Sequence, residues 1–79
     1  MTGQRLAIIV GANEPVEFVF ELSFDDERGT LRGPDVRKLW HLTAGKTFDI
    51  VCDEKRLVSC AFLDGPKGDL VPFEYLREE

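Results

Sequence analysis

The stretch from residue 45 to residue 76 constrains the fold of this chain more than any other part of it. Residues 47–52 (TFDIVC) and 57–63 (LVSCAFL) place apolar side chains largely at alternate positions, which is the period of a strand with one buried face. The charged residues 53–56 between them (DEKR) predict a turn, so the two strands form a hairpin. This arrangement favours a small, strongly twisted β-sheet over a helical domain.

The register of this hairpin decides which side chains share a face. A turn over residues 53–56 places Phe48 opposite Ala61 and Ile50 opposite Ser59, because antiparallel partners count outward from the turn. The predicted core face holds Phe48, Ile50, Leu57, Ala61 and Leu63, and the other face holds Asp49, Val51, Val58, Cys60 and Phe62. Cys52 and Cys60 then lie on opposite faces, so we expect two reduced thiols rather than a disulfide.

The N-terminal part predicts a second hairpin. Residues 6–10 (LAIIV) are a continuous apolar run, and residues 16–24 (VEFVFELSF) alternate between apolar and polar positions. The turn between them lies near Asn13, which tolerates a positive φ. Residues 25–33 (DDERGTLRG) are polar and contain two glycines, so we predict a loop there.

A short helix is predicted near residues 34–42. Proline suits the first helical turn, where its missing N–H costs nothing, and Val36, Leu39 and Trp40 recur at the spacing of one helical face. A last strand at residues 70–76 contains Pro72, which removes a backbone donor and marks an edge. The sequence thus predicts a single α+β domain, mainly β, with about five strands in a small barrel or twisted sheet.

The composition limits the classes of function. The 79 residues carry a formal net charge of −5, which repels phosphate, so we expect no direct binding to nucleic acid. No apolar run approaches the roughly 20 residues that a membrane span needs, and no signal-peptide pattern opens the chain. We therefore expect a cytoplasmic protein with reduced cysteines and no contact with a membrane.

The C-terminal part resembles the second half of a Src homology 3 domain. The likeness lies in the segment GKTFDIV that begins at Gly45, in the strand VSCA that ends at Ala61, and in the segment GDLVPFEYL from residue 68 to residue 76. Domains of that family are small β-barrels with an aromatic-lined groove that binds proline-rich peptides. The resemblance implies an SH3-like barrel here, with Pro72 and Tyr75 at positions of groove residues.

The chain offers few groups for catalysis. His41 is the one histidine, and either Cys52 or Cys60 could pair with it as a nucleophile. Both cysteines lie in apolar strands, where thiols are usually inert, and their spacing does not fit a zinc site. We therefore expect no metal, no cofactor and no enzymatic activity, with a small thiol-dependent enzyme as an alternative.

Candidate contacts with a partner come from three places. The acidic run at residues 25–27 suits a basic surface, although a solvated loop also explains it. Tryptophan is enriched at interface hot spots but also fills cores, and the aromatic residues of the last strand either close the barrel or face a partner. The candidate contact residues are Asp25, Asp26, Glu27, Trp40, Pro72, Phe73 and Tyr75.

These observations favour a non-enzymatic protein that binds another protein, such as a small bacterial or phage regulator or inhibitor. The net charge predicts a partner with a basic surface. The alternative is an acidic decoy that blocks a nucleic-acid-binding groove, and its binding would weaken steeply with added salt. A homodimer is a further expectation, because self-association would cover a strand edge at residues 6–10 or 70–76.

Overall fold

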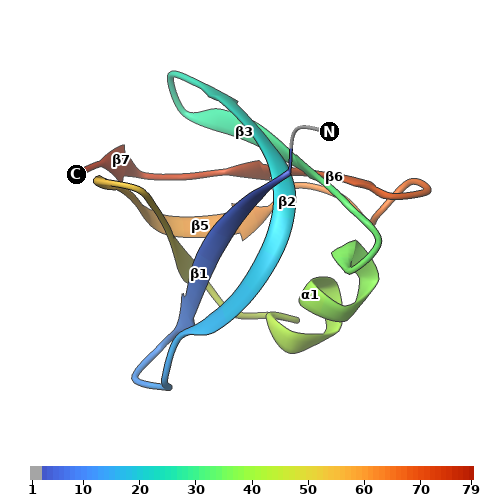
Figure 1. Ribbon diagram of the computed structural model, residues 1–79, viewed down its shortest axis with the longest axis horizontal. Helices are drawn as coiled ribbons and strands as arrows, with labels where there is room; N and C mark the ends of the chain where they lie inside the picture. Colours follow the sequence, from blue (N-terminus) through green and yellow to red (C-terminus); the bar gives the residue numbers. More distant parts are fainter. Residues whose placement is uncertain (1–2) are drawn as a thin grey trace.

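Residues 3–79 are described in the computed structural model of this protein, and they form a closed antiparallel β-barrel with one short helix (Figure 1). The prediction of a mainly β fold with a helix near residues 34–42 is confirmed. The elements in chain order are β1 (Gln4–Val10), β2 (Val16–Asp25), β3 (Arg28–Arg32), α1 (Val36–Leu42), β4 (Phe48–Cys52), β5 (Lys55–Phe62), β6 (Leu70–Glu74) and β7 (Arg77–Glu78).

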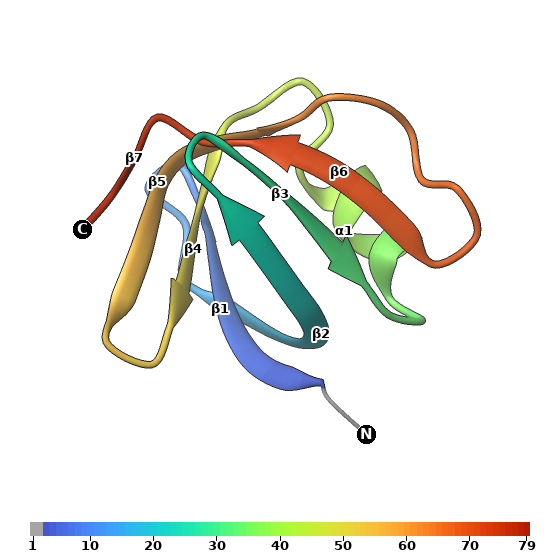
Figure 2. The ribbon, with the colours of Figure 1, turned by 90° about the horizontal axis from the view of Figure 1, so that it is seen from above.

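The barrel consists of two interlocking three-stranded meanders. β1, β2 and β3 follow one another, as do β4, β5 and β6, and the meanders are joined by β1 to β4 and by β3 to β6. Pairing of β4 with β5 closes the cycle, so six strands form the barrel. The short β7 pairs with the first half of β5, on the edge opposite β4, and β6 pairs with the end of β5. β2 is long and bends, and its first half pairs with β1 while its second half pairs with β3 (Figure 2).

Alternation along β2 fills the barrel with aromatic rings. Phe18 and Phe20 are buried and stack at 5.4 Å between ring centroids, while the intervening Val19 is exposed. α1 lies at one end of the barrel, where Val36 and Leu39 are fully buried (Figure 1). Thr43 ends the helix, and its hydroxyl donates a hydrogen bond to the Leu39 carbonyl at 3.0 Å. Within residues 3–79, no helix has the length and apolar character needed to cross a membrane.

The predicted loop at residues 25–33 is wrong, because most of it forms β3. Asp25 pairs with Arg28 across a two-residue turn, and Leu31 is fully buried. The outward side chains of this strand are polar, and its inward position at Gly29 lacks a side chain, which hides the alternation in the sequence. A Cβ at Gly29 would lie 2.6 Å from Phe73 Cζ, so the glycine makes room for that ring.

The predicted register of the hairpin at residues 47–63, which is formed by β4 and β5, is also wrong. The turn holds two residues instead of four, since Cys52 pairs with Lys55, and Asp53 adopts a φ of 55°. Phe48 then pairs with Cys60 and Ile50 with Leu57, so Asp49 opposes two residues of β5 in a β-bulge. Cys60 therefore enters the core, where the sequence predicted Ala61, which is half-buried. Leu63, also predicted for the core, is 44% exposed.

The strands at residues 6–10 and 70–76 are not free edges. β1 lies between β2 and β4, and β6 lies between β3 and β5. β6 ends at Glu74, before the predicted end of the strand. Pro72 faces Thr30 of β3, and its carbonyl accepts a hydrogen bond from Leu63 N–H at 3.0 Å. The edge argument for a homodimer therefore has no basis in these strands.

Candidate functional site

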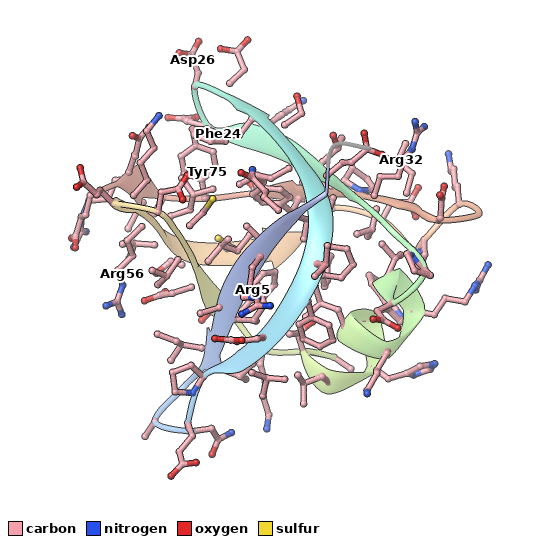
Figure 3. The ribbon with its side chains drawn as sticks, in the orientation of Figure 1. Arg5, Phe24, Asp26, Arg32, Arg56 and Tyr75 are labelled. Atoms are coloured by element: carbon pink, nitrogen blue, oxygen red, sulfur yellow. The ribbon has the colours of Figure 1, made fainter. Side chains whose placement is uncertain are left out.

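The residues predicted as partner contacts fall into separate environments (Figure 3). Phe73 is fully buried and Tyr75 is only 6% exposed, so both side chains belong to the core, while Pro72 is half-buried. The acidic residues are exposed in the turn between β2 and β3, where Asp26 lies at the top of the view. Trp40 is half-buried in α1, at the other end of the barrel. The structure thus offers two surfaces rather than one site.

Tyr75 holds the acidic turn in place. Its backbone N–H donates a hydrogen bond to the Glu27 carbonyl at 3.0 Å, and its hydroxyl donates one to the Asp25 carbonyl at 3.3 Å. Its ring meets the Phe24 ring edge-on, with the centroids 5.9 Å apart. The resemblance placed Tyr75 in a ligand groove, but its buried side chain instead anchors the turn between β2 and β3.

Three carboxylates act electrostatically on this tyrosine, and we call the residues Asp25, Asp26 and Glu78 the acidic face. Burial raises the pKa of the Tyr75 hydroxyl, and the charges of Glu78, Asp26 and Asp25 raise it further. β7 therefore places Glu78 where its charge acts on the Tyr75 hydroxyl, which the sequence did not indicate. Lys55 lies beside this face, with its ammonium 5.6 Å from the centroid of the Phe24 ring.

The second surface is an apolar hollow of about 290 Å³ beside α1, which we call the Trp40 hollow. It is lined by Trp40, by residues 43–47, and by Ala61 and Phe62 at the end of β5. The bulge in β5 shifts the side-chain alternation, so Phe62 packs against the core from this side. The sequence placed Phe62 on the outer face of the hairpin and gave no sign that it would meet Trp40.

Three aromatic rings connect this hollow to the core. Trp40 and Phe62 lie 5.4 Å apart between ring centroids, and Phe62 and the buried Phe48 lie 4.9 Å apart. Rings at these distances attract one another beyond the effect of burial alone. The indole is therefore held by Phe62 while part of its surface stays accessible to a partner.

The charged residues of α1 and of the lining of the hollow are basic. Residues 36–48 contain Arg37, Lys38 and Lys46 and no Asp or Glu. Lys46 lines the hollow, and Arg37 lies one helical turn before Trp40, hence on the same side of α1. Among the residues that the structure describes, none of these three cations forms an ion pair. The sequence already carried this signal as a basic segment without acidic residues.

The two thiols are free and poorly suited to nucleophilic attack. Burial raises the pKa of the Cys60 thiol to about 12, and its S–H donates a weak hydrogen bond to the Leu57 carbonyl, with 3.4 Å between sulfur and oxygen. Burial and then the Asp53 carboxylate raise the pKa of the Cys52 thiol. Both thiols are therefore protonated near neutral pH, whereas a thiolate is the reactive form. Within residues 3–79, no three His, Cys, Asp or Glu side chains gather as metal ligands would.

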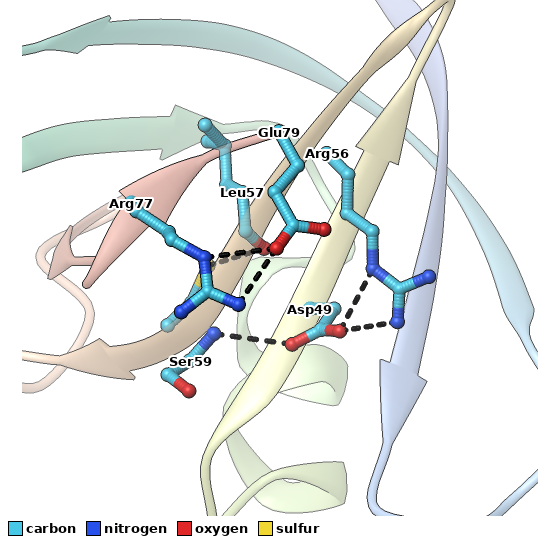
Figure 4. Close-up of polar contacts among 7 residues, drawn as sticks. Asp49, Arg56, Leu57, Ser59, Arg77 and Glu79 are labelled. Carbon is cyan, nitrogen blue, oxygen red and sulfur yellow. Dashed lines mark hydrogen bonds and ion pairs between the residues drawn. The ribbon is translucent and has the colours of Figure 1, made fainter.

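A polar cluster on the outside of β4 and β5 has a structural role (Figure 4). Asp49 accepts a hydrogen bond from Ser59 N–H at 3.1 Å and another from Arg56 Nε at 3.0 Å. Ser59 has a φ of 55°, which is strained for a residue with a side chain. The carboxylate thus satisfies the N–H group that the bulge leaves without a strand partner.

We expect Asp49→Ala to lower the free energy of unfolding by about 2 kcal/mol, because hydrogen bonds to a charged group contribute roughly 1.5–3 kcal/mol. Urea unfolding followed by circular dichroism measures the change. Asp69→Ala is the control, since the Asp69 side chain forms an exposed pair with Arg32 at 3.7 Å, and its loss should change stability by less than about 0.5 kcal/mol. Equal effects of the two substitutions would contradict the role assigned to Asp49.

Comparison with protein-family models, curated proteins and solved structures finds no match to this chain. The closed six-stranded antiparallel barrel is compatible with an SH3-like barrel.

Proposed function

We propose that this protein is a non-enzymatic protein-binding domain and that the Trp40 hollow is its contact surface. The observation that carries the proposal is a half-buried tryptophan stacked on Phe62 at the wall of an apolar hollow. Tryptophan, tyrosine and arginine are enriched among the few residues that dominate binding energy at protein interfaces. The free thiols support a reducing compartment, and we assign the protein to the cytoplasm.

The mode of binding differs from the one that the Src homology 3 resemblance implies. That family reads proline-rich peptides with exposed aromatic residues. The Tyr75 ring is buried here, and its hydroxyl is bonded to the Asp25 carbonyl. We therefore keep the small barrel and propose a different surface.

Trp40→Ala tests the proposal. The wild-type protein is first used to capture partners from a lysate of the source organism. We expect at least one captured protein to bind the Trp40→Ala variant at least about 30-fold more weakly, because hot-spot truncations cost about 2 kcal/mol or more. Ala61→Arg is a second variant that keeps Trp40 and fills the hollow, and it should weaken binding similarly. Affinities are measured by biolayer interferometry with the purified partner.

The matched control is Leu76→Ala, since Leu76 is an exposed apolar residue that does not line the hollow. It should leave the affinity within about twofold. Circular dichroism of each variant checks that the barrel is folded. Retained binding by both Trp40→Ala and Ala61→Arg would reject the hollow as the contact surface.

A second candidate function is an acidic decoy that occupies a basic groove of a nucleic-acid-binding protein. The observations in its favour are the exposed acidic turn at residues 25–27, which Tyr75 holds through two hydrogen bonds, and the charge of Glu78, which also acts on Tyr75. Binding through the acidic face would weaken steeply between low and high salt, because exposed charge pairs are screened. Asp26→Lys would abolish such binding while Trp40→Ala would leave it intact, so the two candidates are separable.

A further inference from the structure

We infer that the partner of the Trp40 hollow is an acidic protein segment that inserts one apolar side chain between flanking carboxylates. This inference rests on the proposed function and specifies its partner. It differs from the basic partner that the net charge of −5 predicts, because charge is distributed unevenly over the molecule. The local charge of the docking surface, and not the total, selects what approaches it closely.

The size of the hollow favours a side chain over a small molecule. Its volume of about 290 Å³ lies at the lower end of the range of ligand pockets. Its lining is mainly apolar, and it includes Trp40, Ala61 and Phe62 together with residues 43–47. An inserted leucine, isoleucine or phenylalanine side chain would contact the indole and the Phe62 ring together.

Two cations near the hollow favour an acidic partner. Lys46 lines the hollow and Arg37 lies on the same side of α1 as Trp40. Both are exposed and unpaired among the described residues, so a partner's carboxylates would replace water and not an internal ion pair. Carboxylates on either side of the inserted residue would therefore reach complementary charges.

Single-stranded nucleic acid also combines stacking on an aromatic ring with cations along its backbone. The chain's negative charge opposes a phosphate backbone, and the basic residues near the hollow are confined to a single short segment. A protein segment needs only one inserted side chain and two or three carboxylates. The observations accordingly favour the acidic protein segment.

The test begins with a random peptide library displayed on phage and selected on the wild-type protein. Trp40 is the only tryptophan of the chain, so its fluorescence reports directly on occupancy of the hollow by synthetic peptides that lack tryptophan. We expect the selected peptides to combine one large apolar residue with neighbouring Asp or Glu. Their affinity should fall at least about tenfold for Lys46→Glu, where attraction becomes repulsion.

Arg5→Glu is the matched control, because it changes the net charge equally at a residue of β1 that does not line the hollow. It should alter the affinity by less than about twofold. Two results would overturn the acidic partner and leave the proposed function intact. One is selection of neutral or basic peptides whose binding depends on Trp40, and the other is an equal loss of affinity for Lys46→Glu and Arg5→Glu. If no selected peptide loses binding to Trp40→Ala, the hollow itself is rejected. Quenching of Trp40 by oligothymidylate at physiological salt would overturn the inference in favour of nucleic acid.

Discussion

Substitution of Gly29 by alanine is expected to lower the free energy of unfolding by about 3 kcal/mol, which is a large part of the total for a domain of this size. The new Cβ would lie 2.6 Å from Phe73 Cζ and 2.6 Å from the Ser23 carbonyl oxygen. The ring is fully buried and the oxygen belongs to the paired strand β2, so neither can move without opening the sheet. Thermal unfolding should show a decrease in Tm of about 10–20 °C.

Gly65→Ala is the control for the loss of glycine itself. A Cβ at Gly65 has no heavy atom within 4 Å, and the residue does not adopt a positive φ. That substitution should leave stability unchanged or raise it by up to about 1 kcal/mol, because alanine reduces the entropy of the unfolded chain. A Gly29→Ala variant as stable as the Gly65→Ala variant would show that Phe73 does not pack against β3 as described.

The second large effect is a loss of stability at alkaline pH that depends on Cys60. Folding raises the pKa of this thiol from 9.0 to about 12, so the folded state holds the proton more tightly than the unfolded state. Its contribution to stability is complete below pH 9, decreases as the pH rises, and is lost above pH 12. A difference of about three units between the two pKa values corresponds to a contribution of at most about 4 kcal/mol to the free energy of unfolding. Of this contribution, about 2–3 kcal/mol should be lost between pH 8 and pH 11.

Urea unfolding at several pH values measures this loss, and Cys60→Ala isolates it from other titrating groups. The variant is less stable at pH 8 because it leaves a cavity, but it should lose about 2–3 kcal/mol less than the wild type on going to pH 11. Cys52→Ala, at a half-buried thiol, should retain most of the wild-type pH dependence. Parallel pH profiles for the wild type and Cys60→Ala would contradict the burial of this thiol.

The sequence predicted most strands and the helix because their apolar periods are strong. Phe18 and Phe20 are buried as the alternation in β2 indicates, and Val36 and Leu39 face the core as the helical spacing indicates. β3 was missed because its inward position at Gly29 has no side chain. A pattern of apolar and polar residues cannot reveal a position whose role is to leave space for a ring from another strand.

The candidate surfaces were harder to predict, since each depends on a feature that breaks a regular pattern. The bulge opposite Asp49 shifts the alternation along β5, and this shift brings Phe62 toward Trp40. A bulge changes the count by one residue and leaves no clear signature in a single sequence. The contact of Tyr75 with Asp25 likewise joins residues 50 positions apart. The sequence indicated the acidic run at residues 25–27 and Trp40 as candidate contacts, but not the residues that each of them meets in the fold.

The interlocking of the two meanders has a consequence for synthesis on the ribosome. Ala7 of β1 pairs with Val51 of β4, and Leu31 of β3 pairs with Val71 of β6. Neither of these strand pairs can form before the C-terminal meander has been synthesised. Until that part emerges, β1 and β3 each lack one of their partner strands. The nascent chain therefore exposes the apolar face of the N-terminal meander for much of its translation, which favours aggregation. Folding is slowed because the paired strands are far apart along the chain.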